Sequence, residues 1–331
     1  MNRIPRCLYN AVALMLWLVT SCSGSNSQDC TRGTATAGGQ HAASKLAETT
    51  AKAPKTTVNR EKIVVAMSAA FVSEQGVSVY RELTDYLTRR LQRPVQLITG
   101  LAYDTINSML EAGVVHVGFV CGLPYVLLRD QPKPAVELLA APIMQARRYQ
   151  GMPKYYSDLI VKKDSPYQKL EDLAGARFVY NEEISNSGYN LPRHHLFERG
   201  LKNRFFGALL RSGSHEESIR MVASGQAEFS FVDSLVLDYD RAMGNGSAHL
   251  VRVLLSIGPA GIPPVVGSTR APADLRESFK KELLHMHRDP EGRRILNKAL
   301  VDRFESVTDD NYNDIRTAYH TPLRAGYTEI K

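Results

Sequence analysis

Residues Ala176 to Pro192 read ARFVYNEEISNSGYNLP, an apolar run followed by a polar loop and the start of a predicted helix. The run from Ala176 to Tyr180 predicts a strand, and the closing proline suits the first turn of a helix. A helix start offers unpaired backbone N–H groups and partial positive charge. With hydroxyls at Ser185 and Ser187 and close backbone approach at Gly188, the loop is a candidate site for a small oxyanion. A plain loop with an N-cap explains the same residues equally well.

The composition indicates a globular protein rather than a nucleic-acid binder. The chain has 331 residues, enough for two lobes with separate cores. Its 44% hydrophobic and 23% charged residues are ordinary values. The net charge of +7 is mild and no concentrated basic stripe is present, so the charge favours anions without predicting nucleic-acid binding.

The N-terminus has the pattern of a targeting segment. Two arginines precede an apolar stretch, Leu8 to Val19, that is short for a membrane span. The following Thr20-Ser21-Cys22 completes a sequence that resembles the lipobox of bacterial lipoproteins. We therefore predict a lipoprotein-type signal peptide over residues 1–22, with Cys22 as the lipidated residue. An ordinary cleaved signal peptide and an uncleaved anchor remain as alternatives.

The next segment predicts a tether. Residues 23–60 are rich in Ser, Thr, Ala, Gly and Lys and poor in large apolar residues. The predicted location is the periplasmic side of the cell envelope, with a lipid anchor in either the inner or the outer membrane. The cysteines show no metal-binding spacing. A Cys30–Cys121 disulfide is possible but not expected, since a flexible tether has no reason to stay near Cys121.

Beyond residue 60, strand and helix patterns alternate, which predicts mixed sheets flanked by helices. Strands are predicted at residues 62–67, 95–98, 114–120, 156–161, 176–180, 209–210, 229–232, 251–257 and 265–266. Helices are predicted around residues 80–91, 104–113, 170–173, 188–200 and 216–223, and from residue 273 to the end.

Two segments of the chain resemble each other. Met109 to Val120 aligns with Met221 to Val232, and the order of helix, glycine, strand and loop is shared. We infer two lobes of like topology, with loops at the carboxyl ends of their strands, where α/β sheets bind ligands. The predicted lobes are 61–154 with 257–331, and 155–256. Two crossings form a hinge, the second at a rigid bend over Gly258 to Pro264.

From Lys62 to Thr321 the chain resembles the substrate-binding proteins of phosphate, phosphite and phosphonate ABC importers, which are type II periplasmic binding proteins. The resemblance implies a two-lobed α/β fold with the ligand between the lobes. It is carried by five segments in the family's order: Gly100-Leu101-Ala102-Tyr103, Tyr155 to Pro166, Ser185 to Gly188 with Pro192, Arg211 to Glu216, and Val232-Asp233-Ser234.

The resemblance also implies roles for particular residues. Ser185 and Ser187, with nearby backbone N–H groups, would hold phosphoryl-type oxygens. Tyr103 would donate its hydroxyl from the first lobe, and His215 would contact an oxygen from the second. Our own inference is that Asp233 accepts a proton from a P–OH group, which favours a partly protonated oxyanion over sulfate.

Departures from the family pattern bear on the ligand. Asn186 stands where the family usually has Thr, and Cys121 stands where some relatives place an aromatic residue in the cleft. Leu235 and Pro263 offer no carboxylate to an ammonium group. We therefore expect a small oxyanion without an amino group; phosphate, phosphite and phosphonates are not distinguished.

Each candidate residue also has a structural interpretation. Tyr103 is suited to capping a strand end, and His215 to a solvated loop. Asp233 is suited to an N-cap of the next helix. Cys121 is suited to a small buried apolar position.

Catalytic and metal sites are not expected. Ser187, His215 and Asp233 supply the residue types of a hydrolase triad, but the chain has no Gly-x-Ser-x-Gly elbow. Neither the pair His194-His195 nor the pair at 285 and 287 shares a helix face, and no Walker loop is present.

The predicted function is the substrate-binding component of an ABC importer, with no enzymatic activity and no cofactor. Its expected partners are a small oxyanion and an ABC permease, and a monomer is expected. The alternative is a lipoprotein that senses a similar anion and signals to a membrane partner. A hydrolase would instead turn over a phosphate ester and lose that activity on Ser187→Ala.

Overall fold

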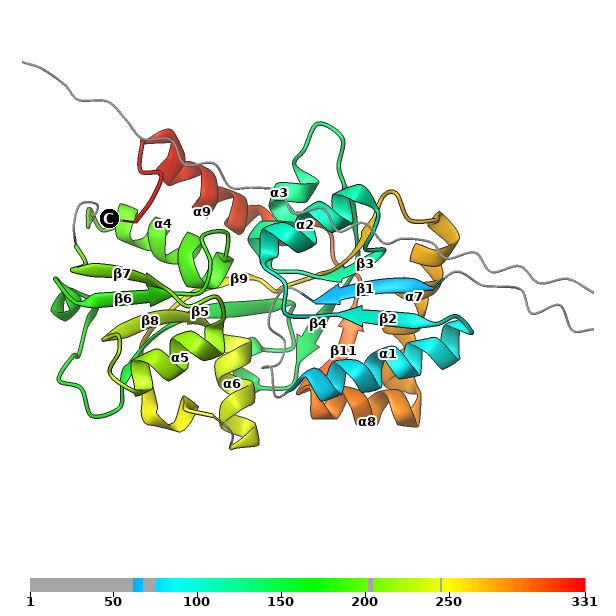
Figure 1. Ribbon diagram of the computed structural model, residues 1–331, viewed down its shortest axis with the longest axis horizontal. Helices are drawn as coiled ribbons and strands as arrows, with labels where there is room; N and C mark the ends of the chain where they lie inside the picture. Colours follow the sequence, from blue (N-terminus) through cyan, green and yellow to red (C-terminus); the bar gives the residue numbers. More distant parts are fainter. Residues whose placement is uncertain (1–61, 68–75, 202–204, 245, 331) are drawn as a thin grey trace, which may run out of the picture. The chain divides into compact units, whose positions relative to one another are not determined.

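The computed structural model describes residues 62–67, 76–201, 205–244 and 246–330. The predicted signal peptide and tether, including Cys22 and Cys30, lie outside the described residues, as does most of the loop after the first strand. Residues 57–331 belong to one compact unit. Two sheets organise the described part of this unit (Figure 1).

The first sheet mixes parallel and antiparallel pairs in the order β11-β4-β10-β3-β1-β2. β1 pairs in parallel with β2 and β3, whereas β10 runs antiparallel to β3 and β4. β11 pairs antiparallel with β4 at the edge. The strands are β1 Ile63–Met67, β2 Val95–Ile98, β3 Val117–Phe119, β4 Val136–Met144, β10 Val265–Ser268 and β11 Val301–Glu305.

The second sheet has the order β7-β6-β8-β5-β9. β6 pairs in parallel with β7 and β8, and β5 runs antiparallel to β8 and β9. Each sheet with its helices is called a lobe below, the first lobe containing β1. The strands are β5 Lys154–Lys162, β6 Arg177–Tyr180, β7 Ala208–Arg211, β8 Phe229–Asp233 and β9 Val251–Gly261.

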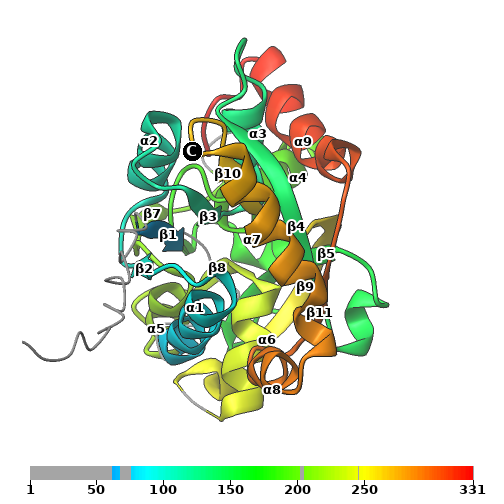
Figure 2. The ribbon, with the colours of Figure 1, turned by 90° about the vertical axis from the view of Figure 1, so that its right-hand side faces the viewer.

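Helices cover both faces of each sheet (Figures 1 and 2). In the second lobe, α4 lies on one face and α5 and α6 lie on the other, and α9 packs against both α4 and α3. The helices are α1 Val77–Leu91, α2 Tyr103–Ala112, α3 Gly122–Arg129, α4 Leu191–Glu198, α5 His215–Ala223, α6 Ser234–Met243, α7 Ala273–His285, α8 Pro290–Lys298 and α9 Asn313–Arg324.

Apolar side chains alternate across the strands of the second sheet and form a core on each face. Phe178, Phe229 and Phe231 belong to the core under α4, whereas Val179 and Val232 belong to the core under α5 and α6. This period of two is what a sheet covered on both faces requires. The two cores fix β6 and β8, whose carboxyl ends carry the candidate site.

The chain passes between the sheets from β4 to β5 and again from β9 to β10. The predicted rigid bend at Gly258 to Pro264 is wrong in its first half, because β9 continues to Gly261 and pairs with β5 as far as Lys154. Backbone pairing with the neighbouring strand outweighs the bend that Gly258-Pro259 suggests. The boundaries of the lobes, 61–154 with 257–331 and 155–256, remain a proposal.

The C-terminal region is not helical throughout, contrary to the prediction from residue 273 onward. β11 separates α8 from α9, with Val301 and Phe304 buried against the first sheet. The predicted strand 114–120 is also shorter in the structure, where β3 covers Val117–Phe119.

The two similar segments do adopt the same local structure. In each, a helix ends near a glycine with positive φ, Gly113 (φ 76°) and Gly225 (φ 78°), and a buried strand follows. That backbone conformation favours glycine, which explains why this residue occurs in both segments. The strands, β3 and β8, lead to the starts of α3 and α6.

Candidate ligand-binding site

All eight residues predicted from the sequence are buried, and all lie where a helix begins. Three belong to the turn that precedes α4, and Ser185 is its N-cap. The other four come from different elements of both lobes. Tyr103 is the first residue of α2, Cys121 the N-cap of α3, His215 the first residue of α5, and Asp233 the N-cap of α6.

The loop predicted to bind an anion does lead into a helix. Its residues Asn186–Asn190 form one π-helical turn that continues as α4. The hydroxyl oxygen of Ser185 accepts the backbone N–H of Gly188 at 3.0 Å, so Ser185 acts as an N-cap. The anion-site and N-cap interpretations of the loop are therefore compatible, since Ser185 caps the turn and Ser187 is a buried residue within it.

Gly188 is required at its position for steric reasons. A Cβ atom added there would lie 1.9 Å from Asn181 Oδ1 and 3.1 Å from Ser185 Oγ. The Asn181 side chain donates from Nδ2 to the hydroxyl of Tyr103 at 3.2 Å, across the two lobes. The missing side chain of Gly188 thus leaves room for a contact between the lobes.

Two further hydrogen bonds join the lobes around the same residues. Glu182, which is buried, accepts the backbone N–H of Tyr103 at 3.2 Å and caps the start of α2. Asn186 donates its backbone N–H to Cys121 Sγ at 3.4 Å. Burial raises the pKa of the Cys121 thiol to about 11, so this free cysteine is a neutral thiol. The two lobes are therefore in direct polar contact at the candidate site.

His215 is neutral, and its tautomer follows from its partners. Burial lowers its pKa to about 3. Its Nδ1 accepts the backbone N–H of Asp233 at 3.3 Å, so the proton belongs on Nε2, which lies 3.4 Å from Ser187 Oγ. His215 thus presents an N–H donor beside Ser187. The solvated-loop interpretation of His215 is wrong, because only 4% of this residue is exposed.

Asp233 serves as an N-cap and also keeps one oxygen without a partner. Its Oδ1 accepts the backbone N–H of Leu235 at 2.8 Å, as the structural interpretation predicted. Its Oδ2 is buried and has no hydrogen-bond partner. Burial raises the pKa of Asp233 well above its ordinary value, and the negative charges of Asp158 and Asp238 act in the same direction. The carboxyl group therefore tends to carry a proton.

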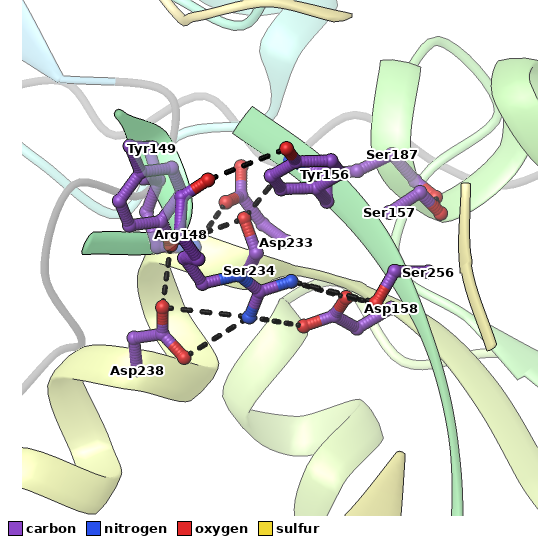
Figure 3. Close-up of polar contacts among 11 residues, drawn as sticks. Arg148, Tyr149, Tyr156, Ser157, Asp158, Ser187, Asp233, Ser234, Asp238 and Ser256 are labelled. Atoms are coloured by element: carbon purple, nitrogen blue, oxygen red, sulfur yellow. Dashed lines mark hydrogen bonds and ion pairs between the residues drawn. The ribbon is translucent and has the colours of Figure 1, made fainter. Parts of the chain in front are cut away.

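Arg148, an arginine near Asp233, is already paired with two acids (Figure 3). It makes two hydrogen bonds to Asp158, at 2.8 and 3.0 Å, and two to Asp238, at 3.2 and 3.5 Å. Its guanidinium also lies over the Tyr156 ring, 5.0 Å from the centroid. Arg148 belongs to the connection from β4 to β5, so this network fixes that connection to the second lobe.

Sequence reasoning missed the polar residues that support the site. Tyr155 on β5 is fully buried, and its hydroxyl oxygen accepts from Asn186 Nδ2 at 2.9 Å. Asn190 donates to Asn186 Oδ1 at 2.9 Å. Tyr155 lies in a segment that carries the family resemblance, but an apolar strand pattern gives no sign that its hydroxyl faces polar groups. Only the folded chain brings these residues together.

Two other features are absent from the described residues. No group of three His, Cys, Asp or Glu side chains in this part of the chain is placed to hold a metal ion. None of the described helices combines the length and apolar character needed to cross a membrane.

Known proteins resemble this chain in sequence and in fold. The model of the family described as "ABC transporter, phosphonate, periplasmic substrate-binding protein" matches residues 65–312. A binding protein component of an ABC phosphonate transporter from Pseudomonas aeruginosa has a TM-score of 0.73 at 18% identity, covering 81% of this chain and 88% of that one.

Two other solved structures share the fold. PhnD1 from Prochlorococcus marinus, in complex with methylphosphonate, has a TM-score of 0.68 at 18% identity. The match covers 80% of this chain and 98% of PhnD1. The aliphatic sulphonate binding protein SsuA from Escherichia coli has a TM-score of 0.52 at 13% identity. The match covers 80% of this chain and 88% of SsuA. The two-lobed fold is therefore that of the type II periplasmic binding proteins, and the family match shows that this chain belongs to the periplasmic substrate-binding proteins of phosphonate ABC transporters.

Proposed function

We propose that the chain captures a small phosphorus oxyanion between its lobes and delivers it to an ABC permease. The observation that carries this proposal is the buried cluster of neutral donors around Ser187. Ser187 Oγ and His215 Nε2 lie 3.4 Å apart, and the buried hydroxyl of Tyr103, from the other lobe, accepts from Asn181 beside Gly188. Preformed donors that face an anion give strong charge-assisted hydrogen bonds.

The state of Asp233 supports a ligand that can share a proton. Because the pKa of this carboxyl is raised, the group tends to donate a proton to an ionised P–O oxygen. A ligand that still carries a P–OH group supplies the shared proton itself if Asp233 is ionised. Sulfate has no such proton near neutral pH, so it could not donate to the unpaired Oδ2 of an ionised Asp233, whereas a protonated Asp233 would donate to either anion. We therefore propose that discrimination against sulfate operates through the ionised form of Asp233.

We further propose a ligand without an amino group. Leu235 and Pro263 are buried and apolar, and they offer no counter-charge to an ammonium. Phosphate, phosphite and methylphosphonate are the candidates.

Calorimetry on the full chain tests the ligand. Phosphate, phosphite, methylphosphonate, 2-aminoethylphosphonate and sulfate are titrated separately, with Ser187→Ala as the control. We expect micromolar or tighter binding of one phosphorus oxyanion without an amino group, and its loss in Ser187→Ala. A folded, ligand-free protein that binds none of them would contradict the proposal.

We propose that the protein is not an enzyme. A hydrolase triad needs His Nε2 as a proton acceptor from Ser and Nδ1 as a donor to Asp. His215 has the opposite tautomer, because its Nδ1 accepts the backbone N–H of Asp233. Incubation with a phosphate ester should give no release of phosphate above the level seen with Ser187→Ala.

We propose that Cys22 is lipidated and holds the protein on the periplasmic side of the cell envelope as a monomer. The proposal rests on the lipobox-like Val19-Thr20-Ser21-Cys22 that follows an apolar stretch. Labelling cells with a radioactive fatty acid should mark the wild-type protein and leave Cys22→Ser unmarked. Light scattering of the Cys22→Ser protein should give the mass of one chain.

A further inference from the structure

The residues predicted to bind an anion include no lysine or arginine, and the neighbouring Arg211 is half exposed and pairs with Glu182 and Glu183. Burial lowers the pKa of His215, which makes the imidazole neutral. Burial raises the pKa values of Cys121 and Asp233, which favours the un-ionised thiol and carboxyl group. Arg148 is neutralised by Asp158 and Asp238. Burying an anion without nearby positive charge is costly. A source of positive potential is therefore to be sought behind the residues that line the site.

Arg193, in the first turn of α4, is a buried cation with no acidic partner among the described residues. Only 4% of the residue is exposed. Its guanidinium donates to the carbonyl oxygens of Thr328 at 2.8 Å and Tyr319 at 3.1 Å, and to Asn190 Oδ1 at 3.2 Å. Burial lowers its pKa, but an arginine keeps its charge in proteins.

The position of Arg193 is unfavourable for a purely structural cation. Burial of a cation without a carboxylate partner costs free energy. Carbonyl oxygens and the Tyr319 ring, 5.4 Å from the guanidinium, offset part of this cost. An anion bound nearby would offset more of it.

A chain of hydrogen bonds leads from Arg193 to the site, and its direction is fixed at the arginine. A guanidinium only donates, so Asn190 must turn its oxygen toward Arg193 and its NH₂ toward Asn186. Asn186 then accepts through Oδ1 and donates through Nδ2 to the hydroxyl oxygen of Tyr155. The Tyr155 proton is then directed onward to Ser187, the other side chain with which the Tyr155 hydroxyl makes a hydrogen bond.

Tyr155 lies among the candidate ligand-binding residues. Its pKa is raised well above the ordinary value by burial first, and then by the proximity of Cys121 and Asp233. Hydrogen bonds that all point the same way polarise one another. A positive charge at one end therefore strengthens the donor at the other end.

We propose that Arg193 is a positioning residue that supplies positive charge to the anion site through Asn190, Asn186 and Tyr155. This inference rests on the proposed function, because it needs an anionic ligand. It assigns Asn186 a role in passing on polarisation, and it adds Tyr155 as the donor to Ser187.

The size of the effect follows from Coulomb's law. A unit charge about 10 Å from a ligand, at an effective dielectric constant of about 20, changes the affinity for a monoanion about tenfold and for a dianion about a hundredfold. Arg193→Met removes the charge and keeps most of the volume. Arg193→Lys keeps the charge but loses the forked hydrogen bonds to the two carbonyl groups.

Calorimetry on the full chain uses the oxyanion that wild type binds most tightly among phosphate, phosphite and methylphosphonate. We expect at least tenfold weaker binding in Arg193→Met, and affinity within about threefold of wild type in Arg193→Lys. A role limited to packing would make the two variants equally weak, because neither rebuilds the guanidinium fork. Arg199→Met is the control, since Arg199 lies at the other end of α4, is half exposed and pairs with Glu171.

Asn190→Ala provides a second test in case both Arg193 variants fail to fold. It interrupts the chain of hydrogen bonds and leaves the cation in place, so weaker binding is expected. Wild-type affinity in folded Arg193→Met or in Asn190→Ala would overturn the proposal. So would equal weakness of Arg193→Lys and Arg193→Met at wild-type thermal stability. If wild type itself binds no oxyanion, the proposed function fails and this inference fails with it.

Discussion

At the residue scale, Asp233 is a candidate-site residue whose proposed function and contribution to stability conflict. Asp233 caps α6 through Oδ1, but its second oxygen is buried without a partner, and ionisation of the carboxyl is opposed in the folded chain relative to the unfolded one. Its retention is understandable if the free oxygen meets a ligand. Asp158 is equally buried, but Arg148 pairs with it, so the two acids should respond in opposite ways to neutralisation.

Asp233→Asn should stabilise the protein at neutral pH. The amide oxygen still accepts the Leu235 N–H, and the cost of an ionisable buried group disappears. Because the folded pKa of Asp233 is raised, its unfavourable effect is absent below the unfolded value of about 3.8 and grows as pH rises. Urea unfolding should show a gain of about 1–2 kcal/mol at pH 7 that vanishes near pH 4.

Asp158→Asn is the matched control for this prediction. It leaves the Arg148 guanidinium with one acid fewer and should destabilise the protein at pH 7. The ligand affinity of Asp233→Asn should fall at the same time. A loss of stability at pH 7 in Asp233→Asn would contradict the assignment of a raised pKa.

The sequence singled out the residues of the candidate site that carry a chemical signature, and it did not single out those defined by packing. Ser185, Ser187 and His215 stand out because hydroxyl and imidazole groups precede predicted helices. Tyr155 and Asn190 look like ordinary members of a strand and a helix start. Their importance depends on hydrogen bonds to Asn186, from β5 on one side and from the turn before α4 on the other, which no local pattern specifies.

At the scale of elements, the turn before α4 is shaped by close packing against the loop after β6. Gly188→Ala should force the Asn181 side chain away, because the new Cβ would lie 1.9 Å from its Oδ1. We expect a loss of about 1–3 kcal/mol in the free energy of unfolding. The displaced Asn181 would also lose its bond to Tyr103, so ligand binding should weaken.

A double variant separates the steric cause from a backbone effect. Asn181→Ala combined with Gly188→Ala removes the atom that clashes, so most of the lost stability should return in thermal unfolding. Ligand binding should stay weak in the double variant, because the Asn181–Tyr103 contact is still missing. If the double variant is as unstable as Gly188→Ala alone, the clash is not the cause.

β6 and β8 are held in place by an aromatic cluster, which gives the site a rigid base. Phe178 is fully buried. Its ring centroid lies 5.1 Å from that of Phe229, on which it stacks, and 5.2 Å from that of Phe206. Phe178→Ala should lower the free energy of unfolding by about 3–5 kcal/mol. Phe205→Ala, at a half-buried neighbour, should cost much less, and equal losses in denaturant titrations would argue against this account.

Elements with strong local patterns were predicted well, and those defined by distant partners were not. β2 and the core of α1 follow from apolar spacing and a Pro break, and the structure confirms them. β11 alternates only weakly and sits at a sheet edge, where pairing with β4 rather than its own sequence makes it a strand. Helix-forming neighbours on both sides made this segment look helical.

At the scale of the whole molecule, the candidate site contains contacts that form between the lobes. The hydrogen bonds from Asn181 to Tyr103, from Tyr103 to Glu182 and from Asn186 to Cys121 all cross between the two sheets. The order of helix, glycine, strand and loop shared by two segments of the chain predicted two lobes, but not which polar groups would meet. Those contacts belong to a closed arrangement, and separating the lobes would return each partner to water.

Cys121 can report on the opening of the lobes. Its thiol is fully buried, its pKa is about 11, and it receives an N–H from the opposite lobe. A maleimide reacts with an accessible thiol, so labelling requires opening. The test uses a variant in which Cys7, Cys22 and Cys30 are replaced by serine, so that Cys121 is the remaining thiol.

Ligand should slow this labelling by stabilising the closed arrangement. If the ligand binds only when the lobes close on it, the labelling rate falls by a factor of one plus the ligand concentration over Kd. At a hundred times Kd the rate should therefore drop about a hundredfold. Ser187→Ala in the same background should show no protection at that concentration, because it does not hold the ligand. A rate that ligand leaves unchanged in a protein shown to bind it would mean that Cys121 is exposed by some motion other than separation of the lobes.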